Sequence, residues 1–425
     1  MYFTSKYSLL ILLFFLCSFP ALLAEDSKYL RGRMEDILDV VADDVQHNFY
    51  DPKLKGLDWK ALRAQAHQQI RQSQHIGEMI SAISGLLYQL NDSHTIFIPP
   101  GRTEHAVYGF KAKPFGEDVY VYEVKKDGPA AKAGLELGDK VVGLNQFNVK
   151  RERFFDLMFY LEVLNPNMEL DLTVLRNGAE KMIRIPTKLE LHSPSFFGDF
   201  LQWRYKEPEE LYSHKDYEGN VGYIKLRTFM TYPERLMPMM GKVKSSAAVI
   251  LDLRNNGGGS EDALAFLSGY FTEEPFDLLM KVSRDRSEPL RVKPHSSIKA
   301  PLFVMVDSAS ASAAEVFARA LQLRRRAVII GDKSSGRVNR ASLFWEKVGA
   351  FDFTPFGTEI AVSKGVLPNG EELENRGVTP DVLCIPNADD LHNEKDPCLD
   401  RAIDLARKTI VENSTSANPT VSQSH

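Results

Sequence analysis

Serine alternates with alanine where an apolar segment of the chain gives way to a helical one. Residues 302–306 are wholly apolar and predict a buried strand, residues 308–313 read Ser-Ala-Ser-Ala-Ser-Ala, and the residues from Glu315 onward predict a helix. A serine at a helix start lies among backbone N–H groups that favour negative charge. A serine of this turn could therefore attack a carbonyl carbon, although the same serines could also form an ordinary helix cap.

A second stretch contains three glycines that could bring backbone amides close to such a reaction. Gly257, Gly258 and Gly259 follow the apolar strand predicted over 247–251. The attack of a serine on a carbonyl creates a negatively charged oxygen, and its N–H donors must lie about 3 Å away. The alternative for these glycines is a plain turn between a strand and a helix.

Together the two stretches resemble motifs of the carboxy-terminal processing serine peptidases. The sequence SASASAAEVFARAL resembles the nucleophile motif of that family, whose serine stands three residues before a glutamate, and this implies Ser312 as the nucleophile. The sequence DLRNNGGG resembles the DLRxNxGG loop of the family. The resemblance implies that Gly258 and Ala313 supply the two N–H groups of the oxyanion hole.

The base that would activate the serine departs from the family's usual pattern. A serine hydroxyl is a weak nucleophile and needs a partner that takes its proton. Many members use a lysine 25 residues after the serine, but this chain has Arg337 there, and arginine stays protonated. Lys333 is close in sequence but does not match the position. A catalytically inactive protein that binds peptides is therefore the alternative function.

The tricorn branch of this group uses a serine, a histidine, a second serine and a glutamate instead. The sequence NDSHT at 91–95 follows a predicted helix and resembles the Ser-His pair of that branch. The resemblance implies that His94 is the general base, since imidazole accepts protons near neutral pH. It also implies that Ser93 orients the imidazole ring, as the third member of a triad would.

A glutamate completes this arrangement. The sequence ENRGVTPD, which begins at Glu374, resembles the segment of the tricorn branch that carries the glutamate. The resemblance implies that Glu374 bonds to Ser93, while Glu371 and Glu372 lie close enough in sequence to be alternatives. The implied activity is that of a serine endopeptidase, which hydrolyses peptide bonds of protein or peptide substrates through an acyl-enzyme on Ser312.

Helices are predicted to position the Ser-His pair. Apolar residues recur at three- and four-residue steps between Met34 and Val45, and a break follows at 48–56. Asp58 is a candidate N-cap for a helix that starts at Trp59. With a third helix up to Leu90, these patterns predict an N-terminal helical region over residues 25–98.

Residues 101–190 predict short strands and turns and resemble a PDZ domain. The run GPAAKAGLELGDKVVGLN at 128–145 is close to that family's usual sequence, and Tyr108, Gly109 and Phe110 stand where the family has its carboxylate-binding loop. Such a domain binds a free peptide carboxylate on backbone N–H groups. The resemblance implies peptide binding at these three residues and recognition of substrate C-termini. A β-domain that only packs against its neighbours is the alternative.

The remainder, residues 200–410, alternates apolar strands with helical segments. Strands are predicted over 221–226 and 327–330 as well as in the two segments above. The continuous apolar character of 247–251, 302–306 and 327–330 indicates a sheet covered on both faces. The predicted fold class is α/β, and the resemblance implies a ClpP/crotonase-like β/α peptidase core with a PDZ-like β-domain and an N-terminal helical region. Polar residues 411–425 predict a disordered tail.

Composition limits the partners of the protein. The chain has 425 residues with a formal net charge of -5, and its pI of about 6.1 argues against nucleic acid as a partner. It has no metal-binding or nucleotide-binding motif, so we expect neither a metal nor another cofactor. Protein or peptide substrates are the expected partners, and an oligomer is possible.

Residues 1–24 have the pattern of a secretory signal peptide. Lys6 precedes the apolar run at 9–16, and Ala24 precedes an acidic pair. We expect a secreted or periplasmic protein with no membrane span after signal removal, and an uncleaved anchor is the alternative. In an oxidising compartment Cys384 and Cys398 could pair across a short loop, or both could stay free.

Overall fold

The computed structural model describes residues 8–100, 104–164, 168–191, 210–349 and 353–417. Residues 1–7 of the predicted signal peptide and residues 418–425 of the predicted tail lie outside the described residues. The chain divides into two compact units. The first unit contains residues 1–101 and 341–362, and the second contains residues 102–340 and 363–425.

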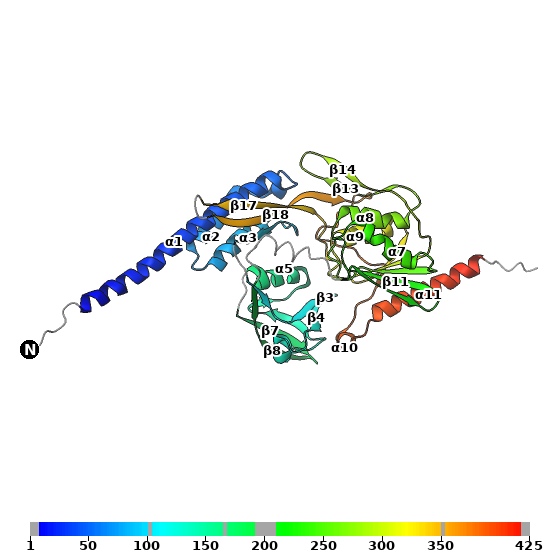
Figure 1. Cartoon of the computed structure of the whole chain (residues 1–425), viewed down its shortest axis with the longest axis horizontal. Coiled ribbons are helices and arrows are strands. Elements are labelled where there is room, and N and C mark those ends of the chain that lie inside the picture. Colours follow the sequence, from blue (N-terminus) through cyan, green and yellow to red (C-terminus); the bar gives the residue numbers. More distant parts are fainter. Residues whose placement is uncertain (1–7, 101–103, 165–167, 192–209, 350–352, 418–425) are drawn as a thin grey trace, which may run out of the picture. The chain divides into compact units, whose positions relative to one another are not determined.

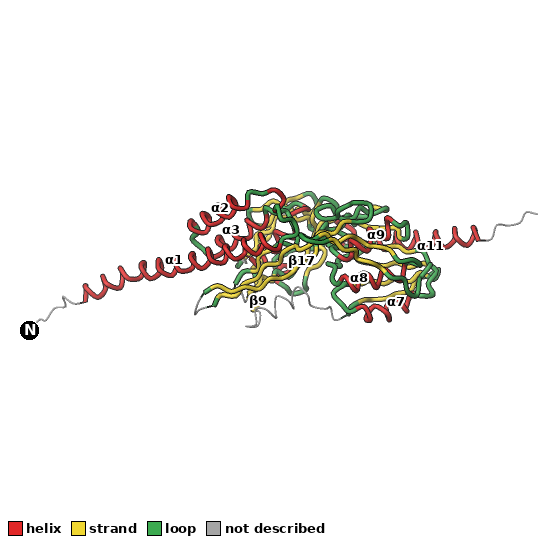
Figure 2. Tube along the Cα trace, turned by 90° about the horizontal axis from the view of Figure 1, so that it is seen from above, coloured by secondary structure: helices red, strands yellow, loops and turns green. Residues whose placement is uncertain are grey.

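Three helices of the first unit lie side by side (Figure 2). They are α1 (Ser8–Asn48), α2 (Trp59–Gln72) and α3 (Ile76–Tyr88), and a short helix η1 (Leu54–Gly56) follows α1. The Asp58 side chain accepts a hydrogen bond from the Ala61 N–H at 3.0 Å, which confirms the predicted cap of α2. The apolar residues predicted to share a face of α1 are fully buried, and they include Ile37, Leu38 and Val41.

Strand pairing fixes the chain directly after the Ser-His pair. β1 (Ile96–Ile98) pairs antiparallel with the first part of β18 (Thr354–Val366), with Ile96 opposite Glu359. β17 (Arg340–Val348) also pairs with β18. The hydroxyl of Thr95, the residue after His94, accepts a hydrogen bond from the Ala361 N–H at 3.2 Å. Residue 95 is thus tied to a strand from the far end of the sequence.

The PDZ-like part of the second unit is a sheet with the strand order β3-β4-β5-β7-β8, and β6 pairs with β5. Its elements are β3 (Phe110–Phe115), β4 (Asp118–Val124), α4 (Pro129–Lys132), β5 (Lys140–Leu144), β6 (Phe147–Asn148), η2 (Arg151–Arg153), α5 (Phe154–Phe159), η3 (Tyr160–Leu164), β7 (Glu169–Arg176) and β8 (Ala179–Pro186). Residues 154–164 form α5 followed by a π-helical turn, η3. A separate pair joins β2 (Glu104–Val107) to β9 (Lys188–Leu191).

The core of the second unit is a sheet with the order β10-β11-β12-β15-β16-β19. Its strands are β10 (Tyr212–Tyr217), β11 (Val221–Leu226), β12 (Ala248–Asp252), β15 (Leu302–Val306), β16 (Ala327–Gly331) and β19 (Val382–Leu383). All neighbours pair in parallel except β10, which is antiparallel to β11. The strands predicted from continuous apolar runs are therefore confirmed as strands of a largely parallel sheet.

Helices cover both faces of this sheet, which explains why β15 and β16 carry no polar side chain. Leu251 and Val304 pack on the side of α7 (Met237–Val243), α8 (Glu261–Ser268) and α9 (Ala313–Leu323). Ile250 and Phe303 pack on the other side, against α11 (Pro397–Ala417) (Figure 1). Shorter elements complete the core: η4 (Pro233–Leu236), η5 (Gly269–Phe271), β13 (Phe276–Val282), β14 (Ser287–Val292) and α10 (Ala388–His392).

The C-terminal helix extends further than the sequence predicted. Residues 411–417 were expected to be disordered because they are polar, but α11 continues to Ala417. Cys398, Ala402 and Ala406 anchor the helix because they are buried against the sheet. Its last turns contain an ion pair between residues four positions apart, in which Lys408 Nζ lies 3.8 Å from Glu412 Oε1. None of the described helices has both the length and the apolar composition needed to cross a membrane.

Candidate active site

Ser312 lies in the short connection between β15 and α9, with an unusual backbone conformation. Its φ is 53° and its ψ is -119°, a region that costs a residue with a side chain about 1–3 kcal/mol and is often occupied at functional sites. The Ser312 N–H donates to the Arg337 carbonyl at 2.7 Å and lies 3.0 Å from Glu315 Oε2. These two contacts hold the strained residue, and its side chain remains half-exposed.

The other serines of the turn are bound to backbone groups. Ser310 is fully buried, and its hydroxyl donates to the Leu253 carbonyl at 2.8 Å. Ser308 is also buried and donates to the Pro114 carbonyl. Ser312 is therefore the most accessible serine of the three, which agrees with the nucleophile implied by the sequence motif.

Gly258 lies directly beside Ser312, as its predicted role requires. It has a φ of 94°, and a β-carbon at this position would lie 2.6 Å from Ser312 Cβ and 3.0 Å from the Ala313 nitrogen. The Ala313 N–H has no acceptor among the described residues, whereas the Gly258 N–H donates to Asn256 Oδ1 at 2.9 Å. One of the two predicted oxyanion donors is thus open, and the other bonds to a neighbouring side chain.

Glu315 organises the turn, a role that the motif alone did not reveal. It is fully buried, and its carboxylate accepts hydrogen bonds from Ser312 N–H, the Ser334 hydroxyl, Gly336 N–H and Arg337 N–H. Burial raises the pKa of Glu315 to about 7, although the four donors act in the opposite direction. A glutamate three residues after a helix cap is the sequence signal that could have found this contact.

We predict that Glu315→Gln destabilises the protein by about 2 kcal/mol, because an amide cannot accept all four hydrogen bonds and leaves a buried N–H unsatisfied. The raised pKa adds a pH dependence. A carboxyl whose pKa rises from 4.5 to about 7 on folding stabilises the protein most below pH 4.5, and this contribution is lost as the pH rises to 7. Thermal unfolding at several pH values should show that the difference in Tm between wild type and variant becomes smaller as the pH rises from 4.5 to 7.

The matched control is Glu372→Gln, because Glu372 forms a partly exposed ion pair with Lys364. Such a pair contributes about 0–1 kcal/mol. Equal losses of stability in the two variants would contradict the prediction that the buried hydrogen bonds of Glu315 stabilise the protein more than a surface ion pair does.

Arg337 and Lys333 differ in their environments. The Arg337 guanidinium pairs with Asp156 of α5 and lies 5.9 Å from the ring centre of Phe155, so this side chain links the loop after β16 to the PDZ-like part. Lys333 is exposed. A lysine acts as a base at neutral pH where burial or a neighbouring cation removes its proton, and exposure provides no such environment.

Of the three neighbouring glutamates, Glu374 is the one that contacts the loop after Arg337. Its Oε2 accepts hydrogen bonds from Val338 N–H at 2.9 Å and Asn339 N–H at 3.2 Å. Glu371 pairs with Arg319 instead, and Glu372 pairs with Lys364. The three glutamates therefore have different partners, and which of them bonds to Ser93 stays a prediction.

Ser93 and His94 form a preassembled pair in the first unit. The distance from Ser93 Oγ to His94 Nδ1 is 2.9 Å. Asp92 orders the same turn, because its Oδ1 accepts hydrogen bonds from His94 N–H and the Thr95 hydroxyl. The structure thus assembles Ser312, Ala313 and Gly258 in the second unit, with Glu374 on the adjoining loop, and the Ser-His pair in the first.

The predicted carboxylate loop leads into an edge strand. Tyr108 is buried, with its hydroxyl donating to the Leu161 carbonyl at 2.9 Å. Gly109 has a φ of 78°, and a β-carbon there would lie 2.9 Å from Pro129 Cδ. Phe110 begins β3, which among the described strands pairs with β4 alone. Among the described strands the second edge of β3 has no strand partner, although its Pro114 carbonyl accepts a hydrogen bond from Ser308. A peptide strand could be added to the part of this edge before Pro114.

A buried ion pair joins this edge strand to the turn that carries the serine. Lys113 of β3 donates to Asp307 Oδ2 and to Asn255 Oδ1, and both members of the ion pair are buried. Asp307 Oδ1 accepts hydrogen bonds from the Asn255 and Ala309 N–H groups. Burial acts to raise the pKa of Asp307, but Lys113 and the N–H donors outweigh it and lower that pKa. Sequence analysis missed Lys113, because its partners are remote in the chain.

The chain matches two protein families. Residues 220–384 match the model of Peptidase family S41, and residues 90–187 match that of the PDZ domain. The region of the S41 match contains Gly258, Ser312 and Glu374, and the region of the PDZ match contains the carboxylate loop. The two matches cover the regions in which the sequence resembles a peptidase core and a PDZ domain.

Curated relatives are similar over much of the chain. Carboxyl-terminal-processing peptidase 1, chloroplastic, of Arabidopsis thaliana is 24% identical over 335 residues, which are 74% of this chain and 64% of the relative. C-terminal processing peptidase, chloroplastic, of Tetradesmus obliquus is 25% identical over 364 residues, which are 80% and 75% of the two chains. The chain thus spans less than two thirds of the length of the Arabidopsis relative.

Solved structures support the fold class. Mature CPAF has a TM-score of 0.68 at 15% identity, covering 91% of this chain and 100% of that one. The photosystem II D1 C-terminal processing protease has a TM-score of 0.50 at 22% identity, covering 83% and 93%. At these identities the similarity concerns the fold, and it confirms the predicted α/β architecture.

Proposed function

We propose that this chain, which carries a peptidase family S41 core and a PDZ domain, is a serine endopeptidase that hydrolyses peptide bonds through an acyl-enzyme on Ser312. One observation carries the proposal. Ser312 has a strained backbone at the start of α9, beside Gly258 and the unbonded N–H of Ala313. Such an arrangement suits a nucleophile at the end of a parallel strand, with the Ala313 amide able to bind an oxyanion.

In the proposed reaction His94 first accepts a proton from Ser312 and later donates it to the leaving group. His94 Nε2 takes the proton of the Ser312 hydroxyl while the oxygen attacks the substrate carbonyl carbon. The Ala313 and Gly258 N–H groups stabilise the oxyanion, and the Gly258 N–H must then exchange Asn256 for the substrate. His94 gives its proton to the leaving amine, and the acyl group stays on Ser312. Water then attacks the ester and restores both residues.

The hydrogen-bond pattern assigns a chemical role to Ser93. For His94 Nε2 to accept a proton, the ring hydrogen must lie on Nδ1. The Ser93 oxygen, 2.9 Å from Nδ1, then accepts that hydrogen bond, and the Ser93 hydroxyl donates its own hydrogen to a carboxylate. Glu374 is the proposed carboxylate, since it already contacts the loop after Arg337. The carboxylate and Ser93 together would stabilise the imidazolium that forms during the reaction.

We further propose that the PDZ domain binds the C-terminal carboxylate of the substrate. Gly109 and Phe110 lead into the edge of β3 that has no partner among the described strands. Lys113 of the same strand pairs with Asp307. A peptide added to this edge would have its carboxylate at Gly109, and its preceding residues would run toward the end of β3 that contacts the core. The expected substrates are therefore proteins or peptides with an accessible C-terminal segment.

Substrate peptides with a free or an amidated C-terminus test this proposal. We expect the free acid to be cleaved with the lower KM, and we expect Gly109→Ala to raise that KM about tenfold at unchanged kcat, because it removes binding energy alone. Gly178→Ala is the control, since Gly178 also has a positive φ of 76° in the same domain but open space around it. Equal KM values for acid and amide would refute the carboxylate site, and binding without any cleavage would favour the inactive peptide-binding alternative.

We also propose that the chain is secreted or periplasmic. The signal-like pattern of residues 1–24 supports this, as does the disulfide between Cys384 and Cys398, because such bonds persist in oxidising compartments. N-terminal sequencing of the protein from its native cells is expected to read from Glu25. A mature chain that still begins at Met1 would favour the uncleaved anchor.

A further inference from the structure

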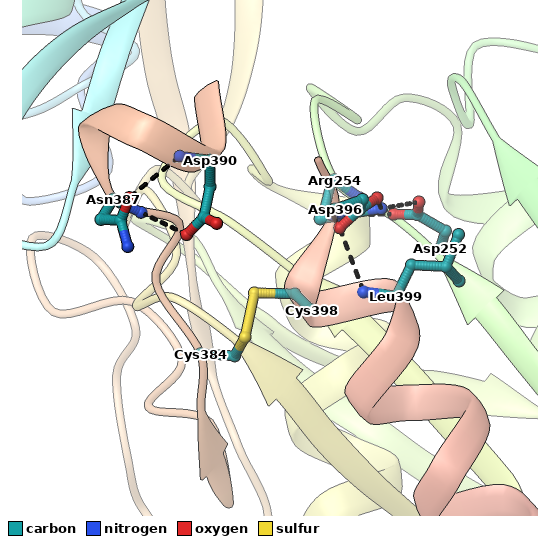
Figure 3. The surroundings of a disulfide bond; sticks show 8 residues. All are labelled: Asp252, Arg254, Cys384, Asn387, Asp390, Asp396, Cys398 and Leu399. Carbon is teal, nitrogen blue, oxygen red and sulfur yellow. Dashed lines mark hydrogen bonds and ion pairs between the residues drawn. A yellow bond between two sulfur atoms is a disulfide. The ribbon is translucent and has the colours of Figure 1, made fainter. Parts of the chain in front are cut away.

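The chain between Cys384 and Cys398 forms a loop closed by their disulfide bond (Figure 3). We call residues 384–398 the disulfide-closed loop. Cys384 follows β19, and its N–H donates to the Gly331 carbonyl at the end of β16. Cys398 lies in the first turn of α11 and is buried against the sheet. The bond therefore ties the start of α11 to the edge of the sheet.

Asp396, near the end of this loop, has two partners. Its Oδ1 accepts a hydrogen bond from the Leu399 N–H at 3.0 Å, which caps α11. The same carboxylate binds the Arg254 guanidinium through two contacts, of 2.8 Å and 2.7 Å (Figure 3). Paired contacts of this kind between arginine and a carboxylate fix geometry as well as charge. Asp396 thus connects a helix start to a residue of the DLRNNGGG stretch.

Arg254 connects Asp396 to the glycine loop, which we define as residues 255–259. On its other side the guanidinium binds the fully buried Asp252, and its N–H donates to the same carboxylate. Arg254 therefore lies between two carboxylates directly before Asn255. Asn256 and Gly258, which is proposed as an oxyanion donor, follow within the next four residues.

We propose that Asp396 is a positioning residue for the oxyanion hole, held in place by the disulfide-closed loop. The expected effect on kcat rests on the proposed peptidase function, whereas the expected effect on the structure of the glycine loop does not. With the disulfide intact, Asp396 faces Arg254, and the glycine loop keeps the backbone geometry that places Gly258 beside Ser312. Reduction by a dithiol transfers two electrons and two protons to the bond and leaves two thiols, while the dithiol becomes a cyclic disulfide. The start of α11 then loses its covalent tie, and the Asp396–Arg254 contact loosens.

Asp396→Asn separates the two roles of the side chain. Asparagine caps helices about as well as aspartate, so α11 is retained, but it has no charge and one acceptor oxygen for Arg254. We expect kcat for peptide hydrolysis to fall about tenfold with KM within about twofold of wild type, since the oxyanion is bound in the transition state. Reduction of the wild-type protein by dithiothreitol should also lower kcat. The kcat of a Cys384→Ala/Cys398→Ala variant should not change when dithiothreitol is added.

Asp390→Asn is the matched control. Asp390 lies in the same loop, where it caps α10 with Asn387 and does not contact Arg254 (Figure 3). Hydrogen exchange of residues 253–259, measured by mass spectrometry in a Ser312→Ala background, does not depend on catalysis. We expect exchange there to be about tenfold faster or more after Asp396→Asn or reduction, and unchanged after Asp390→Asn.

The outcomes separate the two proposals. Unchanged exchange in both Asp396→Asn and the reduced protein, or equal changes in Asp390→Asn, would overturn the inference. If exchange responds as expected but the wild type hydrolyses no peptide, the proposed function fails and the positioning role of Asp396 stands. A rise in KM at unchanged kcat would also contradict the inference, because it would place the effect in peptide binding.

Discussion

Ser312→Ala is expected to reduce kcat for peptide hydrolysis about ten-thousand-fold or more, with little change in KM. The hydroxyl is the group that forms the acyl-enzyme, and alanine leaves only the oxyanion donors and the bound substrate to accelerate attack by water. Steady-state kinetics on a peptide with a free C-terminus measures both constants. Because the Ser312 side chain is half-exposed, its loss should not unfold the protein.

Ser335→Ala is the control for this variant. Ser335 is a half-buried serine on the neighbouring loop, and its backbone N–H donates to the Ser310 carbonyl. The same chemical change at this position should leave kcat within about twofold of wild type. Activity that survives Ser312→Ala would assign the nucleophile to another residue.

His94→Ala is expected to reduce kcat by a factor of about 100 to 10,000, the range that a general base usually contributes. The imidazole accepts the serine proton and returns it to the leaving amine, and no other histidine is implied by the motifs. Ser93→Ala should have a smaller effect in the same direction, because it removes the partner of Nδ1 at 2.9 Å but leaves the ring. Both effects should appear in kcat, since neither residue is proposed to bind the peptide.

Lys333→Ala tests the alternative base. Because Lys333 is exposed, we expect its loss to change kcat by less than about twofold. If instead Lys333→Ala abolished hydrolysis while His94→Ala retained it, the base would be the lysine, and the serine–lysine chemistry of related peptidases would apply.

The central sheet could be predicted because its signals are local. The apolar run at 302–306 forms β15 over Leu302–Val306, and the apolar run at 247–251 forms most of β12. Continuous apolar strands arise whenever helices cover both faces of a sheet, so the pattern can be read without knowing the partners. The resemblance to family motifs likewise implied roles for Ser312, Gly258 and Ala313, and these residues adjoin one another in the structure.

Contacts between distant parts of the sequence could not be predicted. Lys113 reaches Asp307 across 194 positions, and Arg254 reaches Asp396 across 142. Charged residues are mostly solvent-exposed, so the sequence alone does not indicate that Lys113 is buried or that Arg254 pairs with Asp396. The engagement of the Gly258 N–H by Asn256 was also beyond sequence reasoning, because it depends on a side-chain rotamer within the loop.

Labelling with a serine-reactive fluorophosphonate tests the central claim most directly. The reagent forms a covalent bond with an activated serine, and mass spectrometry identifies the modified residue. We predict that Ser312 is labelled in the wild type and in Lys333→Ala, and that labelling is about a hundredfold slower or more in His94→Ala. Labelling of a different serine, or equal rates in wild type and His94→Ala, would contradict the proposal that His94 activates Ser312.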